Sequence, residues 1–424
     1  MKKLLKAVVA FFLGLVARAV VRRYHPKIVM VTGSVGKTST KDAVAAVLAS
    51  RFLVRKSEKS FNSEFGVPFT ILGVKNPWND PTAWFSLIQH SFALLFLPNH
   101  YPNMLVLEVG ADRPGDLARI LRIATPDAVV VTRLPEVPVH VEAYTSPEAV
   151  RDEEFSPAYA LKAAAPLIIS ADDPYARERT KNTPARVISY GNALDATVRV
   201  SDIGFYASSG KVIGMRATAT LEGEQGELIV KGSVGPAQIS PAAAACAVAT
   251  VFDISLTDAL TALESYEPPA GRGRLLLGKD DITIIDDSYN ASPVAVEHAL
   301  GNLKLFPEAS RRIAVLGDML ELGRYSVVEH ERIGVLARGA ADVVIAVGIR
   351  ARAFGTVEGK AEVMLFDNAS AAAKALGEVI KPGDVVLVKG SQSIRMERVV
   401  RALLANPSDA KYLVRQERKW QERS

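Results

Sequence analysis

The segment Val29–Thr40 constrains the fold of this chain more than any other part of the sequence. The apolar run Ile28–Val31 is typical of a buried parallel strand, and a short turn that contains glycine follows it. Residues Lys41–Ser50 then show the apolar spacing of a helix. A strand, a turn ending in Gly-Lys-Thr and a helix form a cradle for phosphate, because backbone N–H groups and the positive end of the helix dipole face the anion. The segment therefore predicts a nucleoside triphosphate site.

The polar residues of this loop have separate expected roles. Lys37 is expected to reach the terminal phosphates, and the Thr38 hydroxyl is expected to hold Mg²⁺. The general pattern of such loops has glycine at the position that Val31 occupies, so the loop departs from it once. The residues expected to surround the phosphates are Gly33, Ser34, Val35, Gly36, Lys37, Thr38 and Ser39.

Length and composition indicate a globular protein of several domains. The 424 residues suffice for two or three domains, and 49% of them are hydrophobic. The single cysteine, Cys246, excludes an intrachain disulfide and fits a reducing cytoplasm. The net charge of +5 is small, and much of the excess lies at the two ends. Solvated termini explain this pattern more simply than nucleic acid does, so no nucleic-acid partner is expected.

Two apolar segments leave a choice between packing and contact with a membrane. The uncharged stretch Ala7–Ala17 would span only about half of the ~30 Å hydrocarbon core as a helix. A retained helix is expected, either packed on the domain, which is favoured, or lying at a membrane surface. The segment Trp84–Leu97 is also rich in large apolar residues and predicts a buried helix or a second interfacial element. The expected location is cytoplasmic, at the inner face of the membrane if these helices face lipid.

The order of strands and helices predicts an α/β protein with two sheets. Short apolar runs separated by helical segments between residues 28 and 250 indicate a mostly parallel sheet, with a small antiparallel extension at 195–233. The Pro- and Gly-rich stretch 266–274 is expected to be a hinge, and the series after it predicts a doubly wound, Rossmann-like domain. The expected divisions are an N-terminal helix (1–27), a central P-loop-type domain (28–268), a C-terminal domain (269–408) and a basic tail (409–424).

Several further motifs follow the phosphate loop in a fixed order. They are Asn62-Ser63-Glu64-Phe65-Gly66-Val67-Pro68, LEVGADRPGD at 107–116, ADDP at 171–174, Gly271-Arg272, DDSYNASP at 286–293, LGDMLELG at 316–323 and Lys389-Gly390-Ser391. With these motifs, residues 28–405 resemble the Mur ligase superfamily, and within it the members that add D-alanyl-D-alanine to a UDP-N-acetylmuramoyl-tripeptide. The resemblance implies ATP-dependent amide formation on a cell-wall precursor. In that reaction a carboxylate takes the γ-phosphate as an acyl phosphate, and an amine then displaces phosphate.

The resemblance also implies roles for single residues. Glu108, at the end of a strand, and His140, in a later loop, would join Thr38 around Mg²⁺. Arg272 at the hinge would reach the phosphates of ATP when the domains close, and with Lys37 it would stabilise the transferring charge. The other residues that would face ATP or the substrates are Asn62, Ser63, Asp286, Asp287, Asn290, Lys389 and Ser391. Asp318 and Glu321 follow another strand, where an ordinary helix start explains them nearly as well.

The chain departs from the family pattern at four places. Muramoyl ligases carry a UDP-sugar-binding domain before the phosphate loop, where this sequence has 27 residues before Ile28. Glu154 stands near the position where many members carry a carbamylated lysine, so its carboxylate either contacts Mg²⁺ in place of that lysine or marks a loss of that function. The loop ending at His140 is longer and has Arg133 where asparagine is usual. Ala237-Gln238 replaces a His-Asn pair, which puts the contact with the nucleotide base in question.

Three hypotheses about function and partners follow from these departures. The first is an amide ligase with small-molecule or peptide substrates whose carboxylate donor is lipid-linked or shortened, which would suit contact with a membrane surface. The second is a standard dipeptide-adding ligase whose donor-binding domain is supplied by a separate chain. The third is a nucleotide-binding subunit or regulatory protein that no longer ligates.

Overall fold

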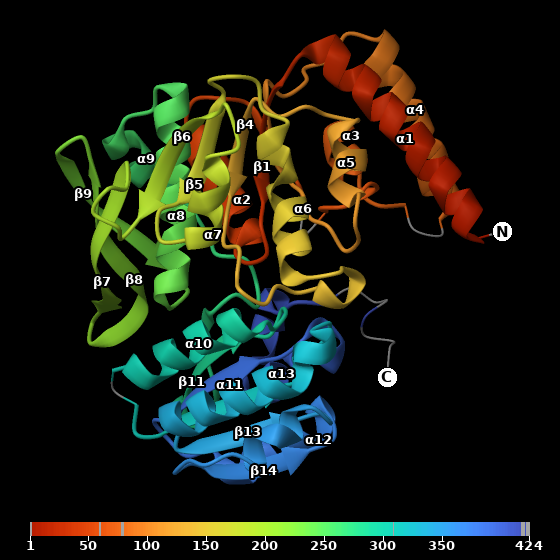
Figure 1. The fold of residues 1–424 in the computed structure, drawn as a ribbon. Helices are drawn as coiled ribbons and strands as arrows, with labels where there is room; N and C mark the ends of the chain where they lie inside the picture. The colour runs from red at the N-terminus through yellow and green to blue at the C-terminus, as the bar shows by residue number, and fades with distance from the viewer. Residues whose placement is uncertain (1, 59–60, 78–79, 308, 417–419, 421–424) are drawn as a thin grey trace.

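The computed structural model describes residues 2–58, 61–77, 80–307, 309–416 and 420. Figure 1 shows two layered units, with the second sheet, in blue-green, below the first. The prediction of a mixed α/β protein with two mostly parallel sheets is confirmed. The divisions at residues 27, 268 and 408 stay predictions, and Arg418, Lys419 and Arg423 of the expected basic tail lie outside the described residues.

The first sheet is parallel over most of its width. In spatial order its nine strands are β2 (Val54–Lys56), β3 (Met104–Glu108), β1 (Lys27–Thr32), β4 (Ala128–Val131), β5 (Pro166–Ser170), β6 (Arg186–Gly191), β7 (Val198–Ser208), β8 (Lys211–Leu221) and β9 (Glu224–Lys231). Only β7–β8 and β8–β9 pair antiparallel. The predicted extension is thus part of the same sheet, because β7 also pairs in parallel with β6 at Tyr190 and Gly191.

Helices cover both faces of this sheet. They are α1 (Lys2–Tyr24), α2 (Lys37–Leu48), α3 (Gly66–Leu72), α4 (Pro81–Phe96), α5 (Asp116–Leu121), α6 (Pro147–Tyr159), α7 (Pro174–Thr180), α8 (Pro236–Ala249) and α9 (Leu256–Leu263). Successive residues of β1 point to opposite faces, so Val29 and Val31 pack in one core cluster and Ile28 and Met30 in another. A central parallel strand buried on both faces explains the continuous apolar run in the sequence.

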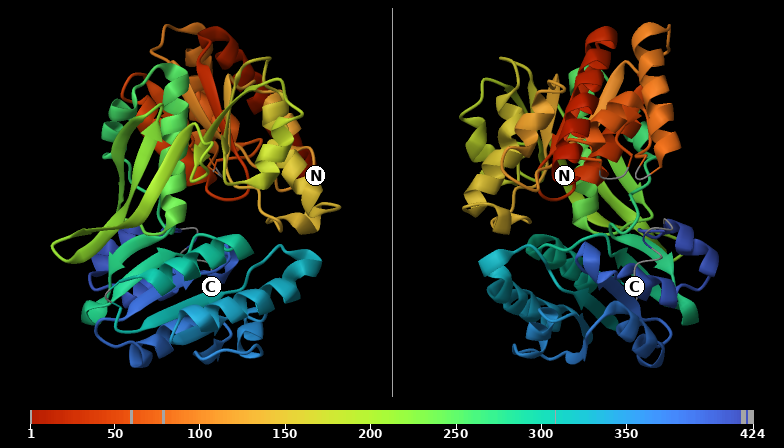
Figure 2. Two further views of the ribbon diagram at one scale, coloured as in Figure 1. Left: turned by 60° about the vertical axis from the view of Figure 1, so that its left-hand side comes forward. Right: turned by 90° about the vertical axis from the view of Figure 1, so that its right-hand side faces the viewer.

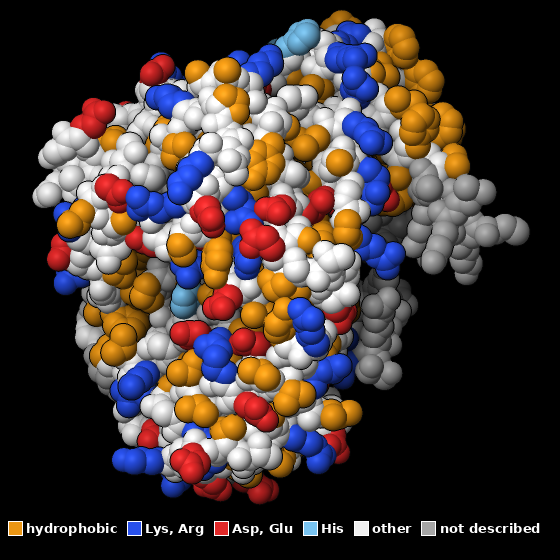
Figure 3. All heavy atoms as spheres, viewed as in Figure 1, with side chains coloured by type: hydrophobic (Ala, Val, Ile, Leu, Met, Phe, Trp, Pro, Cys, Tyr) orange, Lys and Arg blue, Asp and Glu red, His pale blue; other side chains and the backbone are white. Residues whose placement is uncertain are grey.

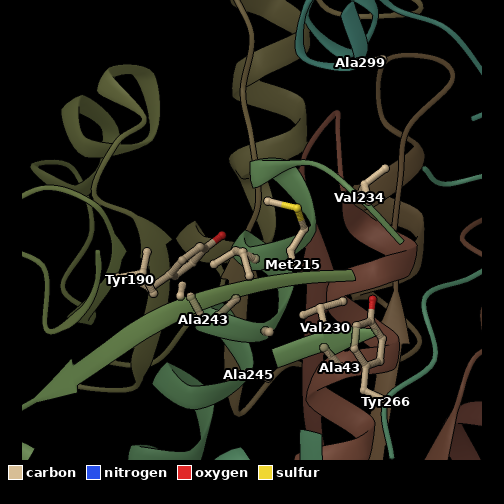
Figure 4. Packing of buried hydrophobic residues seen from close by; sticks show 14 of the residues in the cluster. Ala43, Tyr190, Met215, Val230, Val234, Ala243, Ala245, Tyr266 and Ala299 are labelled. Carbon is tan, nitrogen blue, oxygen red and sulfur yellow. The ribbon is translucent and has the colours of Figure 1, made fainter. Parts of the chain in front are cut away.

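The core on the α2 and α8 side is built largely from small residues. Figure 4 shows Ala43 of α2 and Ala243 and Ala245 of α8 beside larger side chains such as Tyr190 and Met215. Such small residues let two helices and a sheet approach closely while the packing stays dense. Helix α2, which carries the end of the phosphate loop, is therefore held firmly on the sheet.

The second sheet has six strands and follows the predicted hinge. Its spatial order is β10 (Arg274–Leu277), β11 (Thr283–Asp287), β15 (Val385–Lys389), β12 (Arg312–Gly317), β13 (Val343–Val347) and β14 (Glu362–Phe366). Its helices are α10 (Pro293–Leu305), α11 (Ser326–Ala340), α12 (Ala369–Val379) and α13 (Glu397–Leu403).

Strand β10 was not predicted, because its first residue belongs to the stretch interpreted as a hinge. It pairs antiparallel with β11 at the edge of the sheet. The short 3₁₀ turns are η1 (Val141–Ala143), η2 (Thr250–Phe252), η3 (Lys279–Asp281), η4 (Gly323–Tyr325), η5 (Ala351–Gly355), η6 (Gln392–Ile394) and η7 (Pro407–Tyr412).

The N-terminal apolar stretch forms part of α1, which packs against α3 and α4. Leu13, Ala17 and Val20 point into the core on this side, as the favoured packing interpretation requires. Figure 2 shows α1 in red and α4 in orange lying side by side at the edge of the molecule. No helix within the described residues is both long and apolar enough to cross a membrane.

Candidate active site

A polar pocket of about 520 Å³ lies where the two sheets face each other. From the first unit it is lined by the phosphate loop, the end of β3, the loop carrying His140, and α6; from the second it is lined by Arg272 and the loops after β11, β12 and β15. Strand ends and helix starts meet there, which is where ligands bind in open α/β sheets. The pocket therefore gathers most of the motifs that the sequence places far apart.

The phosphate loop has the backbone geometry that its glycines allow. Gly33 and Gly36 have φ angles of 112° and 89°, a region that residues with a Cβ rarely adopt. Gly36 lets α2 begin directly at Lys37, four residues earlier than predicted, so its free N–H groups end in the loop. The Lys37 Nζ atom donates hydrogen bonds to the carbonyl oxygens of Gly33 and, at 3.5 Å, Ser34. Lys37 is thus aligned along the cradle.

Arg133 fixes the phosphate loop through its backbone. The N–H groups of Ser34 and Val35 donate hydrogen bonds to the Arg133 carbonyl oxygen at 2.9 and 3.4 Å. In return, the Arg133 N–H donates to the Val35 carbonyl oxygen at 3.4 Å. These bonds do not depend on the side chain at position 133, which explains how arginine can replace the usual asparagine without loss of the loop.

Thr38 and Glu108 form a buried pair at the base of the pocket. The Thr38 hydroxyl donates to Glu108 Oε1 at 3.1 Å, and Glu108 Oε2 is buried without a hydrogen-bond partner within the described residues. Burial raises the pKa of Glu108, while the charges of Lys41, Lys37 and Arg272 act against that shift. A buried carboxylate oxygen without a donor is costly unless a cation or donor completes it. The pair therefore fits a divalent cation bound beside the phosphates.

Glu154 lies on α6 and reaches the other side of the loop. Its carboxylate accepts a hydrogen bond from the Ser34 hydroxyl, and its backbone oxygen accepts one from the Thr32 hydroxyl at 2.6 Å. Burial raises the pKa of Glu154, and the charge of Lys37 is the largest effect that acts against that shift. The structure thus places a carboxylate at the phosphate loop, and the two interpretations of Glu154 stay predictions.

His140 contacts acidic residues from both units. Its Nδ1 lies 2.8 Å from Glu321 Oε2 of the second unit, and its Nε2 lies 3.6 Å from Asp112 Oδ1 of the first. Burial lowers the pKa of His140, but the hydrogen bond to Glu321 and the nearby negative charges outweigh it and raise the pKa above its ordinary value. Within the described residues, no three His, Cys, Asp or Glu side chains are placed to hold a metal ion.

Arg272 enters the pocket from the connection between the sheets. Its guanidinium carbon lies 4.2 Å from the centre of the Tyr289 ring, and both residues line the pocket. The Ser233 hydroxyl donates to the Arg272 carbonyl oxygen at 2.9 Å, which fixes its backbone. The hinge residue expected to reach the phosphates thus lines the same pocket as Lys37.

The acidic residues after β11 differ in their surroundings. Lys389 Nζ donates to Asp287 Oδ2 at 2.6 Å and to the Asn290 carbonyl oxygen at 3.0 Å. Asp286 has no such partner; its Oδ2 is buried without a hydrogen bond in the described structure, and burial raises its pKa to about 6. These two hydrogen bonds from Lys389 therefore hold the Asp287–Asn290 loop in place.

Not every predicted site residue reaches the pocket. The ones that line it are Ser34, Gly36, Lys37, Thr38, Asn62, Glu108, His140, Glu154, Arg272, Asn290 and Ser391. The ones outside its lining are Gly33, Val35, Ser39, Ser63, Asp286, Asp287 and Lys389. Sequence reasoning did not assign Asp112, Val139, Tyr289, Leu320, Gln392, Ser393 or Trp420, although several lie inside the quoted motifs. Asp318 instead accepts a hydrogen bond from the Ala351 N–H at 2.8 Å, a structural role.

Comparison with known protein families shows which family this chain belongs to. The model of the Mur ligase middle domain matches residues 31–249, just over half of the chain, and that of the Mur ligase glutamate ligase domain matches residues 271–392. The chain belongs to the Mur ligase family. Its two sheets are therefore those of a Mur ligase, and the resemblance inferred from the motifs is confirmed.

The relatives of this Mur ligase include ligases that add D-alanyl-D-alanine. A UDP-N-acetylmuramoyl-tripeptide–D-alanyl-D-alanine ligase of Mycobacterium tuberculosis is 31% identical over 405 residues, covering 89% of this chain and 73% of the relative. The corresponding Bacillus subtilis ligase is 27% identical over 398 residues, with 92% and 79% covered. The crystal structure of the MurF ligase from Thermotoga maritima in complex with ADP has a TM-score of 0.77 and 27% identity, covering 93% and 83%.

Proposed function

We propose that this Mur ligase joins a carboxylate to an amine at the expense of ATP, adding D-alanyl-D-alanine or a related amine to a cell-wall precursor. The observation that carries the proposal is one pocket shared by Lys37, Thr38 and Glu108 of the first unit and Arg272 and Asn290 of the second. The activity in the relatives' names and the ADP of the Thermotoga structure support it.

The chemistry follows from where the positive charges lie. A donor carboxylate oxygen bonds to the γ-phosphorus of ATP as the bond to ADP breaks, which gives an acyl phosphate. The amine nitrogen then bonds to the carbonyl carbon, phosphate leaves with the electrons of the broken C–O bond, and the nitrogen loses a proton. Lys37 of the first unit and Arg272 of the second both line the pocket and would offset the charge that builds on the phosphoryl oxygens. Closure of the two units around bound substrates would exclude water that hydrolyses the acyl phosphate.

Thr38 and Glu108 would hold Mg²⁺ in this proposal. Mg²⁺ usually takes one or two carboxylates together with phosphate oxygens, so a hydroxyl and one buried carboxylate form a sufficient protein contribution. When bound, the ion would neutralise phosphate charge. Glu154 and His140 are proposed as further ligands or as groups that orient water around the ion, on the basis of their places at the loop and the pocket wall.

The amine would enter from the side of the second unit. Ser391, two residues after Lys389, lines the pocket, and so does Asn290, whose carbonyl oxygen accepts a hydrogen bond from Lys389. Asn62, on the first unit, is proposed to face the donor; Gly110 leaves it room, because a Cβ there would lie 2.9 Å from Asn62 Nδ2 and 3.3 Å from Lys37 Cε. Donor and amine would thus approach the phosphates from different walls of one pocket.

Turnover with defined substrates tests the proposal. The purified chain is incubated with ATP, Mg²⁺ and D-alanyl-D-alanine, with and without UDP-N-acetylmuramoyl-tripeptide, and both phosphate and the amide product are measured. We expect phosphate release that depends on the carboxylate and the amine together. Lys37→Ala should lower the rate at least about 100-fold, because it removes a group that stabilises the transferring phosphate.

Other outcomes separate the alternatives. Product that appears only when a second chain is added would favour a separate donor-binding chain. Product that forms only with a lipid-linked carboxylate would favour a membrane-held donor. ATP binding without product from any carboxylate and amine pair would overturn the proposal in favour of a regulatory nucleotide-binding protein.

A further inference from the structure

Helices α1 and α4 form one rigid pair at the edge of the first unit. Tyr24 near the end of α1 donates a hydrogen bond to the Leu94 carbonyl oxygen of α4 at 2.7 Å, and Arg23 donates to the Leu97 carbonyl oxygen at 3.2 Å. The inner sides of the two helices are buried, with Leu13 on α1 and Leu87 on α4 in the same core cluster. The outer sides of both helices therefore face the same way at a fixed separation.

The outer sides carry large apolar residues at helical spacing. The α1–α4 face consists of Val8, Phe11, Phe12 and Leu15 on α1 and Phe85, Ile88, Phe92 and Phe96 on α4, all of them exposed. Among the described residues, every phenylalanine that is exposed to solvent lies on these two helices. Figure 3 shows the resulting gathering of hydrophobic side chains at the upper right of the molecule. A contiguous patch of this kind marks an interaction surface, whereas single exposed apolar residues do not.

Basic residues border this apolar face, and neither helix contains aspartate or glutamate. Arg18 and Arg22 continue along α1 from Leu15 and are exposed. Arg18 also lines a pocket of about 500 Å³ beside α1, together with Arg119 and Arg122; Glu64 lines it too and pairs with Arg119 at 2.9 Å. A helix that binds the surface of an anionic bilayer needs exposed apolar residues flanked by basic residues, and this face has both.

We propose that the α1–α4 face docks this Mur ligase on the surface of an anionic lipid bilayer. The phenylalanines enter the boundary between headgroups and acyl chains, and the arginines contact lipid phosphates. Lipid is a better occupant than a second copy, because the same face of a second copy offers no acidic residue on α1 or α4 to pair with Arg18 and Arg22. Because the inner side of α1 is packed on α3 and α4, docking leaves α1 on the surface of the bilayer.

The docked face adjoins the donor side of the proposed active site. Glu64 lines the pocket beside α1, and Asn62, two residues earlier, lines the pocket of the phosphate loop. If the proposed ligase function holds, a carboxylate donor anchored in the bilayer lies on the same side of the molecule as the docking surface. This consequence rests on the proposed function, whereas the docking itself does not.

Sedimentation with vesicles tests the docking. The full chain is mixed with phosphatidylcholine vesicles, with and without phosphatidylglycerol, in the absence of substrates. We expect co-sedimentation with the anionic vesicles that weakens at high salt, because the charge attraction is screened.

Two variants and their matched controls probe the two parts of the surface. Phe12→Ser with Phe92→Ser should weaken vesicle binding about 100-fold, at about tenfold for each phenylalanine removed from an apolar environment. Arg18→Gln with Arg22→Gln should weaken it about 25-fold on anionic vesicles only, at about fivefold for each basic residue near the surface. The controls are Val327→Ser with Val328→Ser and Lys360→Gln with Lys374→Gln, exposed residues of the second unit that should leave binding unchanged.

Circular dichroism melting establishes that each variant is folded before its binding is compared. Absence of vesicle binding by the folded wild-type chain would overturn the inference, and so would equal losses in the controls. Self-association that Phe12→Ser with Phe92→Ser abolishes, without vesicle binding, would assign the face to a second copy. Vesicle binding without ligase turnover would contradict the proposed function but not the docking. Turnover without vesicle binding would contradict the docking but not the proposed function.

Discussion

His140 and Glu321 join the two units of the chain directly across the active-site pocket. Nδ1 of His140 lies 2.8 Å from Oε2 of Glu321, and both residues line the pocket. His140 comes from the loop after β4 and Glu321 from the loop after β12, so their distance depends on how the units are placed. The pair therefore stabilises the closed arrangement in which Arg272 and Lys37 share one pocket.

The His140–Glu321 pair should make closure depend on pH. The raised pKa of His140 means that the pair stabilises closure fully below the ordinary histidine value of 6.5 and stops doing so as pH rises through the raised value. The lowered pKa of Glu321, caused first by the hydrogen bond from His140, ends the effect at low pH. We expect the closed population to fall about two- to fivefold between pH 6 and pH 9, because both side chains are partly exposed.

Small-angle scattering at the two pH values checks this prediction through the radius of gyration. Glu321→Gln should remove the pH dependence, and Glu331→Gln, an exposed change on α11, should keep it. An unchanged pH dependence in Glu321→Gln would mean that another group controls closure.

Glu108→Gln should weaken the response to Mg²⁺. Glutamine can still accept the hydrogen bond from Thr38, but the buried negative charge that would face the cation is lost. We expect the Mg²⁺ concentration for half-maximal ATP turnover to rise at least about tenfold, with little change in the melting temperature. Glu264→Gln, at the exposed end of α9, is the control. A variant with the wild-type response to Mg²⁺ would remove Glu108 from the proposed metal site.

Arg272→Lys should reduce turnover more than nucleotide binding. Lysine keeps the charge but not the planar group stacked 4.2 Å from the Tyr289 ring, so the charge would be poorly placed on the transferring phosphate. We expect kcat to fall at least tenfold while the Kd of ADP changes by less than about threefold. Arg274→Lys is a matched control, since Arg274 stacks on Tyr412 at 4.5 Å and does not line the pocket. Equal effects of the two changes would contradict a role for Arg272 in the reaction.

Asp286→Asn should stabilise the protein at alkaline pH. Burial raises the pKa of Asp286 from 3.8 to about 6, so the folded state holds the proton more tightly than the unfolded state. Stability is therefore lost as pH rises from about 4 to about 6, and above that range the cost is about 3 kcal/mol. Asparagine removes this cost and can still accept the bond from the Ser288 N–H.

Urea unfolding at pH 4.5 and pH 8 measures this difference. The gain in the Asp286→Asn variant should be large at pH 8 and small at pH 4.5. Asp287→Asn should instead lower stability at pH 8, because it removes the carboxylate paired with the buried Lys389. A loss of stability in both variants at pH 8 would show that Asp286 has a partner that offsets its burial.

Much of the fold could be predicted because its signals are local. A continuous apolar run such as Ile28–Val31 indicates a strand buried on both faces, and Gly33 and Gly36 allow a turn that few other residues can form. The motif order predicted the family for the same reason, since each motif is a short continuous stretch of sequence. The prediction failed where pairing decided the structure: Arg274–Leu277 became an edge strand only because β11 offers it a partner.

The sequence by itself determined the phosphate loop, the two sheets and the residue types available for phosphoryl transfer, because these depend on near neighbours in the chain. Only the tertiary structure decided that His140 meets Glu321, that Arg272 stacks on Tyr289 and that Asp286 Oδ2 lies buried without a hydrogen bond in the described part of the chain. It also decided which sides of α1 and α4 face solvent. These relationships join residues far apart in the chain, so they depend on how the units pack, which no local pattern encodes.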